Sequence, residues 1–278
     1  MASRAYQHNL NGSDVPEGAP QLDVADVALR FGGVQALAGV STRIHQGDIH
    51  AIIGPNGAGK TSLLNCTSGL YRPQQGSITL HTATGTHDLT RLRPSRIAHL
   101  GIARSFQNIE LFSHMSVLDN LLLGRHVHMK HRLRESLLWF GPARRQEIAH
   151  RELVEEVIDL LEIPSVRKQP VGSLPYGFQK RVELGRALCM QPALLLLDEP
   201  MAGMNAEEKE DMARFVLDVN ELAGVTTVLI EHDMGVVMDI SDRVTVLDFG
   251  RVLRTGPPDE VSSDPQVIQA YLGEGDER

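Results

Sequence analysis

The sequence predicts an α/β fold in which helices cover both faces of a mainly parallel sheet. In the C-terminal third, short apolar strands alternate with helices, and near-continuous apolar strands are typical of a sheet buried on both faces. Nearer the N-terminus, an apolar strand, a glycine-rich loop and a helix follow one another, which is another α/β pattern. The expected C-terminal strands are 194–197, 226–230 and 243–247, with helices at 207–222 and 235–240.

The N-terminal half is expected to consist mostly of short strands. Alternating apolar residues predict strands between residues 22 and 44, interrupted at Gly32-Gly33. Gly47-Asp48 predicts a hairpin turn that leads into the next strand. The remaining elements expected here are strands at 49–53, 77–80 and 102–106 and a helix at 61–70.

The middle of the chain has a different character, because its leucines follow a helical spacing. The apolar positions with this spacing are Leu118, Leu121, Leu122, Leu153, Val157, Leu160 and Leu161. They predict a helical subdomain of about residues 108–180, inserted in the α/β part. We therefore expect a disordered N-terminal tail at residues 1–20, a single folded unit at 21–273 and a short C-terminal tail at 274–278.

Composition excludes several classes of protein. The 278 residues carry a net charge of −8, which disfavours non-specific binding to nucleic acid, so no nucleic-acid partner is expected. The two cysteines, Cys66 and Cys189, form no C-x-x-C pair, and this indicates a reducing compartment. The longest purely apolar run is 193–197, far short of a membrane span, and the N-terminus has no apolar signal core.

The glycine-rich loop matches the P-loop template G-x-x-x-x-G-K-[ST] at Gly54, Gly59, Lys60 and Thr61. Glycines allow successive backbone N–H groups to point at phosphate oxygens, and the following helix adds its unpaired N-terminal donors. Lys60 is the expected point charge for the β- and γ-phosphates, and Thr61 the expected hydroxyl ligand of Mg²⁺. The predicted nucleotide-binding residues here are Gly54, Pro55, Asn56, Gly57, Ala58, Gly59, Lys60, Thr61 and Ser62.

Two carboxylates follow the apolar strand at 194–197. Asp198 is expected beside the Mg²⁺, which it reaches through water, and Glu199 is placed to act as a general base on an attacking water. A strand that ends in Asp-Glu is common by itself. Together with the P-loop it predicts a site for a nucleoside triphosphate and Mg²⁺.

A third motif precedes the helix expected at 182–188. Ser173 is a candidate cap of that helix, and Pro175 suits its first turn. The segment 173–181 resembles the signature motif of ABC-type ATPases, L-S-G-G-Q. Leu174 and Gly177 are kept. The departures are Pro175 in place of serine, Tyr176 in place of the first glycine and Phe178 in place of glutamine.

Other positions resemble this family one by one, from Leu22 to Gly273. Gln107 resembles the Q-loop glutamine that senses Mg²⁺ and the attacking water, and His232 resembles the switch histidine at the γ-phosphate. Phe31 is placed like the aromatic residue that stacks on adenine, and Asn205 stands where the D-loop commonly has aspartate. The resemblance implies a P-loop NTPase (RecA-like) core with an antiparallel β subdomain and an inserted α-helical subdomain.

The resemblance also implies a mechanism. Two cassettes pack head to tail, and ATP lies between the P-loop of one and the signature helix of the other. Gly177 presents its backbone N–H to the γ-phosphate across that interface. The dimer closes on ATP, and hydrolysis with Glu199 as general base lets it open again. The catalytic set is then Glu199, His232 and Gln107, and the metal set is Thr61, Gln107 and Asp198.

Finer features resemble the ATPase subunits of branched-chain amino acid importers. They are the segments 231–234 and 240–244 and the ending Ala270-Tyr271-Leu272-Gly273. The longer stretch between Gln107 and the signature resembles the larger of the two ATPases in that family. That family implies a second ATPase subunit, identical or different, polytopic membrane permease subunits and, indirectly, a periplasmic or extracellular solute-binding protein. It places the chain peripherally on the cytoplasmic face of the inner membrane. Relatives that handle urea, amides or organic acids leave the solute open.

Two other classes of function remain as alternatives. One is a soluble ABC ATPase that acts on ribosomes or DNA. Such proteins carry two cassettes or a long coiled coil, and this sequence has neither. The other is a degenerate regulatory ATPase, which Pro175 and Asn205 favour slightly.

Overall fold

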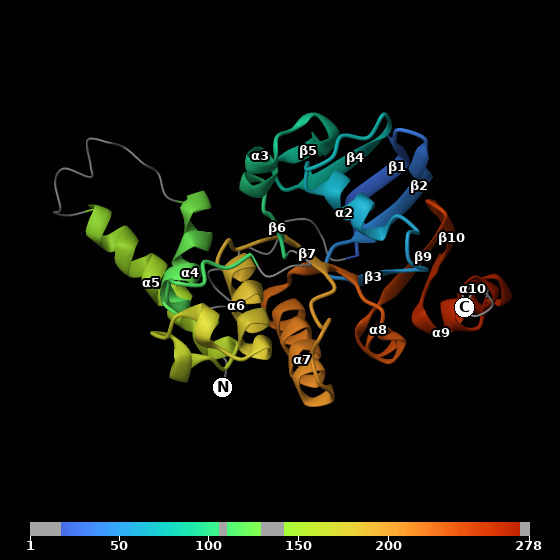
Figure 1. The fold of residues 1–278 in the computed structure, drawn as a ribbon. Helices are drawn as coiled ribbons and strands as arrows, with labels where there is room; N and C mark the ends of the chain where they lie inside the picture. The colour runs from blue at the N-terminus through green and yellow to red at the C-terminus, as the bar shows by residue number, and fades with distance from the viewer. Residues whose placement is uncertain (1–17, 106–109, 129–141, 273–278) are drawn as a thin grey trace.

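The computed structural model describes residues 18–105, 110–128 and 142–272 of the chain. A six-stranded sheet forms the centre, a four-stranded antiparallel sheet lies above it in Figure 1, and helices lie below and to the left. The predicted α/β core, antiparallel subdomain and helical insertion are therefore confirmed.

The central sheet is parallel except at one edge. Its order is β10-β9-β3-β8-β7-β6, and only the β9–β10 pair is antiparallel. Every residue of β3, β7 and β8 is buried, as the apolar runs in the sequence predicted. The strands are β3 (Ile49–Ile53), β6 (Ile102–Arg104), β7 (Leu194–Asp198), β8 (Thr226–Ile230), β9 (Arg243–Asp248) and β10 (Arg251–Gly256).

The antiparallel sheet has the order β2-β1-β4-β5. Its strands are β1 (Pro20–Phe31), β2 (Val34–His45), β4 (Gln75–Thr82) and β5 (Gly85–Asp88). The hairpin predicted at Gly47-Asp48 is wrong, because β2 and β3 belong to different sheets. The physical reason is that β3 is buried on both faces, so it lies between β8 and β9 rather than beside one antiparallel neighbour.

The helix that follows the glycine-rich loop, α2 (Lys60–Thr67), lies between the two sheets. Its Leu63 and Leu64 share a hydrophobic cluster with Leu22 of β1 and Ile52 of β3. The opposite face of the central sheet packs against other helices. They include α6 (Tyr176–Leu188), α7 (Ala206–Ala223) and α8 (Met234–Ile240), and the chain ends with α9 (Pro258–Ser262) and α10 (Pro265–Leu272).

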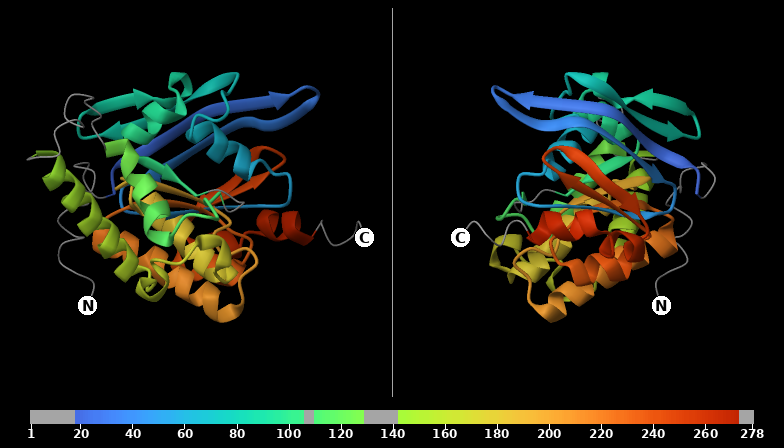
Figure 2. Two further views of the ribbon diagram at one scale, coloured as in Figure 1. Left: turned by 60° about the vertical axis from the view of Figure 1, so that its left-hand side comes forward. Right: turned by 90° about the vertical axis from the view of Figure 1, so that its right-hand side faces the viewer.

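Between β6 and β7 the described regular elements are helices and 3-10 turns, and this part of the chain extends from one end of the molecule in Figures 1 and 2. Gly185 of α6 brings this helix close to its neighbours, because a Cβ there would lie 2.8 Å from Leu121 and 2.9 Å from Leu161. The elements are α4 (Val117–Gly124), α5 (Pro142–Leu160), α6 and the 3-10 turns Arg125–His128, Pro164–Val166 and Val171–Ser173. The predicted limits of tails and subdomain stay predictions.

The remaining short elements lie beside β5 and β6. They are the 3-10 turn Leu89–Arg91 and the helix α3 (Pro94–His99). Within the ranges given above, no helix is long and apolar enough to span a membrane.

Candidate nucleotide-binding site

The glycine-rich loop has the conformation that its glycines permit. Gly54 has φ +142°, and a Cβ there would overlap the carbonyl oxygen of Leu247 in β9. Gly59 has φ +104°, and a Cβ there would lie 2.9 Å from a methyl carbon of Leu37 in β2. Both positions combine a left-handed backbone with close neighbours, so only glycine fits. Pro55, Asn56, Gly57 and Ala58 lie between them, and Thr61 and Ser62 lie in the first turn of α2.

Lys60 folds back over this loop. Its Nζ donates to the carbonyl oxygens of Gly54, at 2.6 Å, and Pro55, at 3.0 Å, and only 7% of the residue is exposed. Since α2 begins at Lys60, the ammonium and the N-terminus of the helix lie at the same place. This juxtaposition of a cation with the N–H groups of a helix N-terminus is suited to an anion such as a phosphate.

Asp198 and Thr61 form the candidate metal pair. The Thr61 hydroxyl donates to Oδ1 of Asp198 at 3.3 Å, although the residues lie on different elements, α2 and β7. Asp198 is fully buried, and this burial raises the pKa of its carboxyl, while the guanidinium of Arg104 acts in the opposite direction. A hydroxyl and a carboxylate side by side are the oxygen donors that Mg²⁺ prefers, so the residues present fit this ion.

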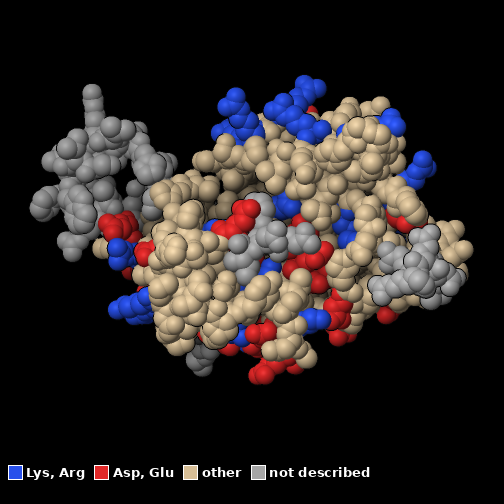
Figure 3. Space-filling view, in the orientation of Figure 1, with Lys and Arg blue, Asp and Glu red and all other residues tan. Residues whose placement is uncertain are grey.

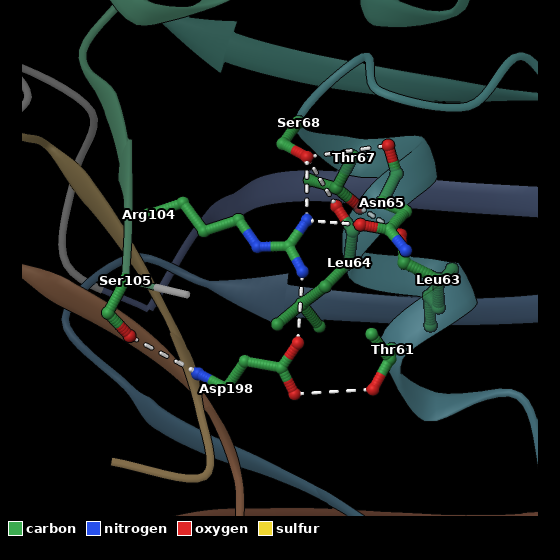
Figure 4. A network of polar contacts seen from close by, with 9 residues as sticks. All are labelled: Thr61, Leu63, Leu64, Asn65, Thr67, Ser68, Arg104, Ser105 and Asp198. Atoms are coloured by element: carbon green, nitrogen blue, oxygen red, sulfur yellow. Dashed lines mark hydrogen bonds and ion pairs between the residues drawn. The ribbon is translucent and has the colours of Figure 1, made fainter. Parts of the chain in front are cut away.

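Arg104, at the end of β6, is the counter-ion of Asp198, and the sequence analysis did not single it out. One of its terminal nitrogens donates to Oδ2 of Asp198 at 2.9 Å. The other donates to Asn65 Oδ1 and, at 3.0 Å, to Ser68 Oγ, both near the end of α2 (Figure 4). The only signal in the sequence was its position three residues before the predicted Gln107.

Glu199 and His232 meet although they follow different strands. His232 Nε2 lies 2.9 Å from Glu199 Oε1, and the Glu199 side chain is 16% exposed. Glu199 has φ +51°, a conformation uncommon for a residue with a side chain, and its N–H donates to Ile230 at 2.9 Å. Such strain persists only where surrounding contacts hold it, and functional sites are where it clusters. The predicted general base and switch histidine are thus neighbours.

Glu231 stabilises the loop that contains Glu199. Its buried carboxylate accepts from the N–H of Met201 at 2.7 Å and from the N–H of His232 at 3.1 Å. Burial raises the pKa of this carboxyl. Glu231 therefore joins the backbone after Glu199 to the backbone of His232. Its place directly after β8 in the sequence did not reveal this role.

The signature segment differs from its prediction in detail. Helix α6 begins at Tyr176 rather than at Val182, and Pro175 occupies the N-cap position rather than the first turn. Ser173 does not cap this helix, because its hydroxyl donates to the carbonyl of Pro170 at 2.7 Å. The reason is that Ser173 ends a 3-10 turn of its own, Val171–Ser173, which holds it away from the first N–H groups of α6.

Gly177 packs against the start of α7 in its own chain. A Cβ on Gly177 would overlap the carboxylate of Glu208. Glu208 forms a capping box with Asn205, in which each side chain accepts from the other residue's N–H at 3.0 Å. Asn205, which departs from the usual D-loop aspartate, is therefore a good helix cap.

The last two predicted residues have different outcomes. Phe31 ends β1 with 46% of its surface exposed, and its ring packs edge to face on Tyr71 with centroids 5.1 Å apart. Nothing in this geometry tests the predicted contact with adenine. Gln107 lies outside the described residues.

In Figure 3, acidic and basic side chains both gather in the middle of the face, below the antiparallel sheet.

Comparisons with known proteins agree with this geometry. A family model described as "ABC transporter" matches residues 37–202, and one described as "Branched-chain amino acid ATP-binding cassette transporter" matches residues 251–277. The high-affinity branched-chain amino acid transport ATP-binding proteins BraF of Pseudomonas aeruginosa and LivG of Salmonella typhimurium are 36% and 38% identical to the chain. Each alignment covers 92% of this chain and 98% of the relative.

Solved structures give the same result. A nucleotide-free ATP-binding cassette from an ABC transporter superposes with a TM-score of 0.77 at 29% identity, covering 91% of this chain and 98% of the other. The ADP conformation of MJ1267, an ATP-binding cassette of an ABC transporter, gives 0.76 at 29% identity, with coverage of 91% and 99%. The chain is therefore an ATP-binding, ATP-hydrolysing subunit that belongs to the ABC transporter family, in its branched-chain amino acid type.

Proposed function

We propose that the chain hydrolyses ATP with Glu199 as general base and uses the energy to drive import of branched-chain amino acids or a related small polar solute. The observation that carries this proposal is the 2.9 Å contact between Glu199 and His232, two residues that follow neighbouring strands of the central sheet. A carboxylate that is oriented by a histidine can accept a proton from water as it attacks the γ-phosphate.

Each side chain of the pocket has a role in this proposal. Lys60 exchanges its loop carbonyl partners for β- and γ-phosphate oxygens, because a bound phosphate offers a full negative charge instead of a dipole. Thr61, Asp198 and, by resemblance, Gln107 hold Mg²⁺. When bound, the ion neutralises charge on the phosphate oxygens. His232 orients Glu199, and Phe31 supports the adenine.

The position of the signature helix favours a two-subunit site. Helices α2 and α6 lie on opposite faces of the central sheet, so the signature helix does not share the face that carries the P-loop helix of its own chain (Figure 1). Gly177 then donates its N–H to the nucleotide of a second ATPase subunit, identical to this chain or different from it. Closure of that dimer on ATP is the mechanical step.

The partners follow from the relatives. BraF and LivG carry names that describe high-affinity branched-chain amino acid transport, and we extend this role to the present chain. The proposal includes polytopic permease subunits, an external solute-binding protein and peripheral attachment on the cytoplasmic face of the cell membrane.

Reconstitution tests the proposal most directly. The chain is purified with its co-expressed permease subunits and placed in liposomes with the solute-binding protein. Uptake of labelled leucine, isoleucine or valine is expected only when ATP is on the same side as the chain. Uptake of urea, short amides or organic acids instead would change the proposed solute but not the proposed class of protein, an importer ATPase. A chain that copurifies with ribosomes or DNA and not with the permease contradicts the proposal.

The altered signature motif gives a separate prediction. Pro175→Ser is expected to change ATP turnover by less than about tenfold, because backbone N–H groups at the start of α6 supply the donors and a serine cap adds only about 1 kcal/mol of helix stability. Steady-state phosphate release by the assembled transporter is the measurement. An increase of an order of magnitude or more would show that the missing serine hydroxyl limits this chain.

A further inference from the structure

The two oxygens of the Asp198 carboxylate face different partners. Oδ1 accepts from the hydroxyl of Thr61 at 3.3 Å, and Oδ2 accepts from Arg104 at 2.9 Å. The arginine therefore fixes the rotation of the carboxylate, so that Oδ1 is the oxygen turned towards Thr61 (Figure 4). An exposed ion pair would not hold a carboxylate in this way, but this pair is almost completely buried, with side-chain exposures of 7% and 0%.

The guanidinium is itself held at its other end. Its second terminal nitrogen donates to Asn65 and Ser68, so one rigid side chain joins three elements: β6, the P-loop helix α2 and the carboxylate at the end of β7. Ser105, the next residue, adds a contact to the same place, since its hydroxyl accepts from the N–H of Asp198 at 3.4 Å. Arg104, at the end of β6, and Ser105, the next residue, thus determine both the rotation of the Asp198 carboxylate and its distance from α2.

We propose that Arg104 is a positioning residue for the metal site, which orients Asp198 and fixes its distance from Thr61 without touching nucleotide or metal. The proposal rests on the proposed Mg²⁺ site at Thr61 and Asp198. Groups that hold a ligating carboxylate by hydrogen bonds tune metal affinity in many proteins. Arginine is suited to the task because its planar fork reaches Asp198 and the α2 acceptors at once, whereas a lysine has a single nitrogen.

The test compares nucleotide binding with and without the metal in the full-length chain. The affinity of a non-hydrolysable ATP analogue is measured by calorimetry in Mg²⁺ and in EDTA, and the ratio of the two affinities is the readout. Arg104→Lys, which keeps the positive charge beside Asp198, is expected to lower this ratio by about 10- to 100-fold, the usual effect of losing a partner of a metal ligand. Its affinity in EDTA is expected to stay within about twofold of the original.

Three further variants complete the test. Arg104→Gln is expected to lower the ratio at least as much and also to lower the thermal midpoint, because it leaves the buried Asp198 without its cation. Arg214→Gln removes an arginine that pairs with Glu162 on the surface, and it should leave the ratio unchanged. In an Asp198→Asn background, Arg104→Lys should cause no further loss, because the arginine acts through that carboxylate.

The outcomes separate this inference from the proposed function. A metal-dependent loss that disappears in the Asp198→Asn background supports the positioning role. Equal losses in Mg²⁺ and EDTA, or a lower thermal midpoint with an unchanged ratio, overturn it and leave Arg104 a structural ion pair. If the original chain bound the analogue no better in Mg²⁺ than in EDTA, the proposed metal site itself would be wrong.

Discussion

Glu199→Gln is expected to reduce ATP turnover by about 100-fold or more, the range that a lost general base costs. The amide cannot accept the proton of the attacking water, yet it has the same shape, and its oxygen can keep the contact with His232 that the carboxylate makes at 2.9 Å. The hydrogen bond from the backbone N–H of residue 199 to the carbonyl of Ile230 is unaffected, because it does not involve the side chain. ATP binding should therefore survive, and the closed dimer should accumulate.

Single-turnover phosphate release, nucleotide affinity and size-exclusion chromatography with ATP measure the three parts of this prediction. The matched control is Glu221→Gln, an exposed glutamate near the C-terminal end of α7, which should turn over ATP normally. Undiminished hydrolysis by the Glu199 variant would show that another group accepts the proton. Negligible hydrolysis by the unaltered chain would instead favour the degenerate regulatory ATPase.

Lys60→Ala is expected to weaken ATP binding at least about 30-fold, since truncating one partner of a desolvated charge pair costs about 2–5 kcal/mol. Lys60 is 7% exposed, so its charge is poorly screened at the phosphates. Turnover should become undetectable. The nucleotide-free protein should lose little stability, because the carbonyls of Gly54 and Pro55 lose one donor each and water can replace it.

Fluorescence titration with a labelled ATP analogue and a thermal melt without nucleotide separate the two effects. Lys168→Ala, at an exposed position outside the site, is the control for a lost positive charge. If the Lys60 variant bound ATP normally, the ammonium would be serving the loop carbonyls alone, and the phosphate-binding role would have to pass to backbone N–H groups.

The sequence predicted the features that depend on local pattern. β3 and β8 have the predicted bounds, Ile49–Ile53 and Thr226–Ile230, because apolar runs between glycines and polar residues leave little freedom. The P-loop and the Asp198-Glu199 pair were equally easy to recognise, since Gly54 directly follows β3 and Glu199 directly follows β7. The false hairpin at Gly47-Asp48 shows the limit: a turn signal gives a change of direction, but not which sheet receives the next strand.

The residues that were missed act through long-range contacts. Arg104 reaches Asp198 across 94 positions of sequence, and Glu231 reaches the backbone of Met201 across 30. Both residues have charged side chains near strand ends. The sequence does not show which charged side chains will be buried against the same partner. Ser173 failed as a cap for the opposite reason, because a short local turn competed with the helix for its hydroxyl.

The close packing of Gly177 on Glu208 changes how this glycine should be interpreted in related chains. Within one subunit a Cβ at position 177 would displace the Glu208 carboxylate and so disturb the capping box of α7, independently of any role at a nucleotide. A cassette that had lost hydrolysis would therefore still gain stability from the glycine for as long as it kept the glutamate. Glycine at this position is therefore weak evidence of activity by itself, and positions 177 and 208 are expected to vary together among homologues.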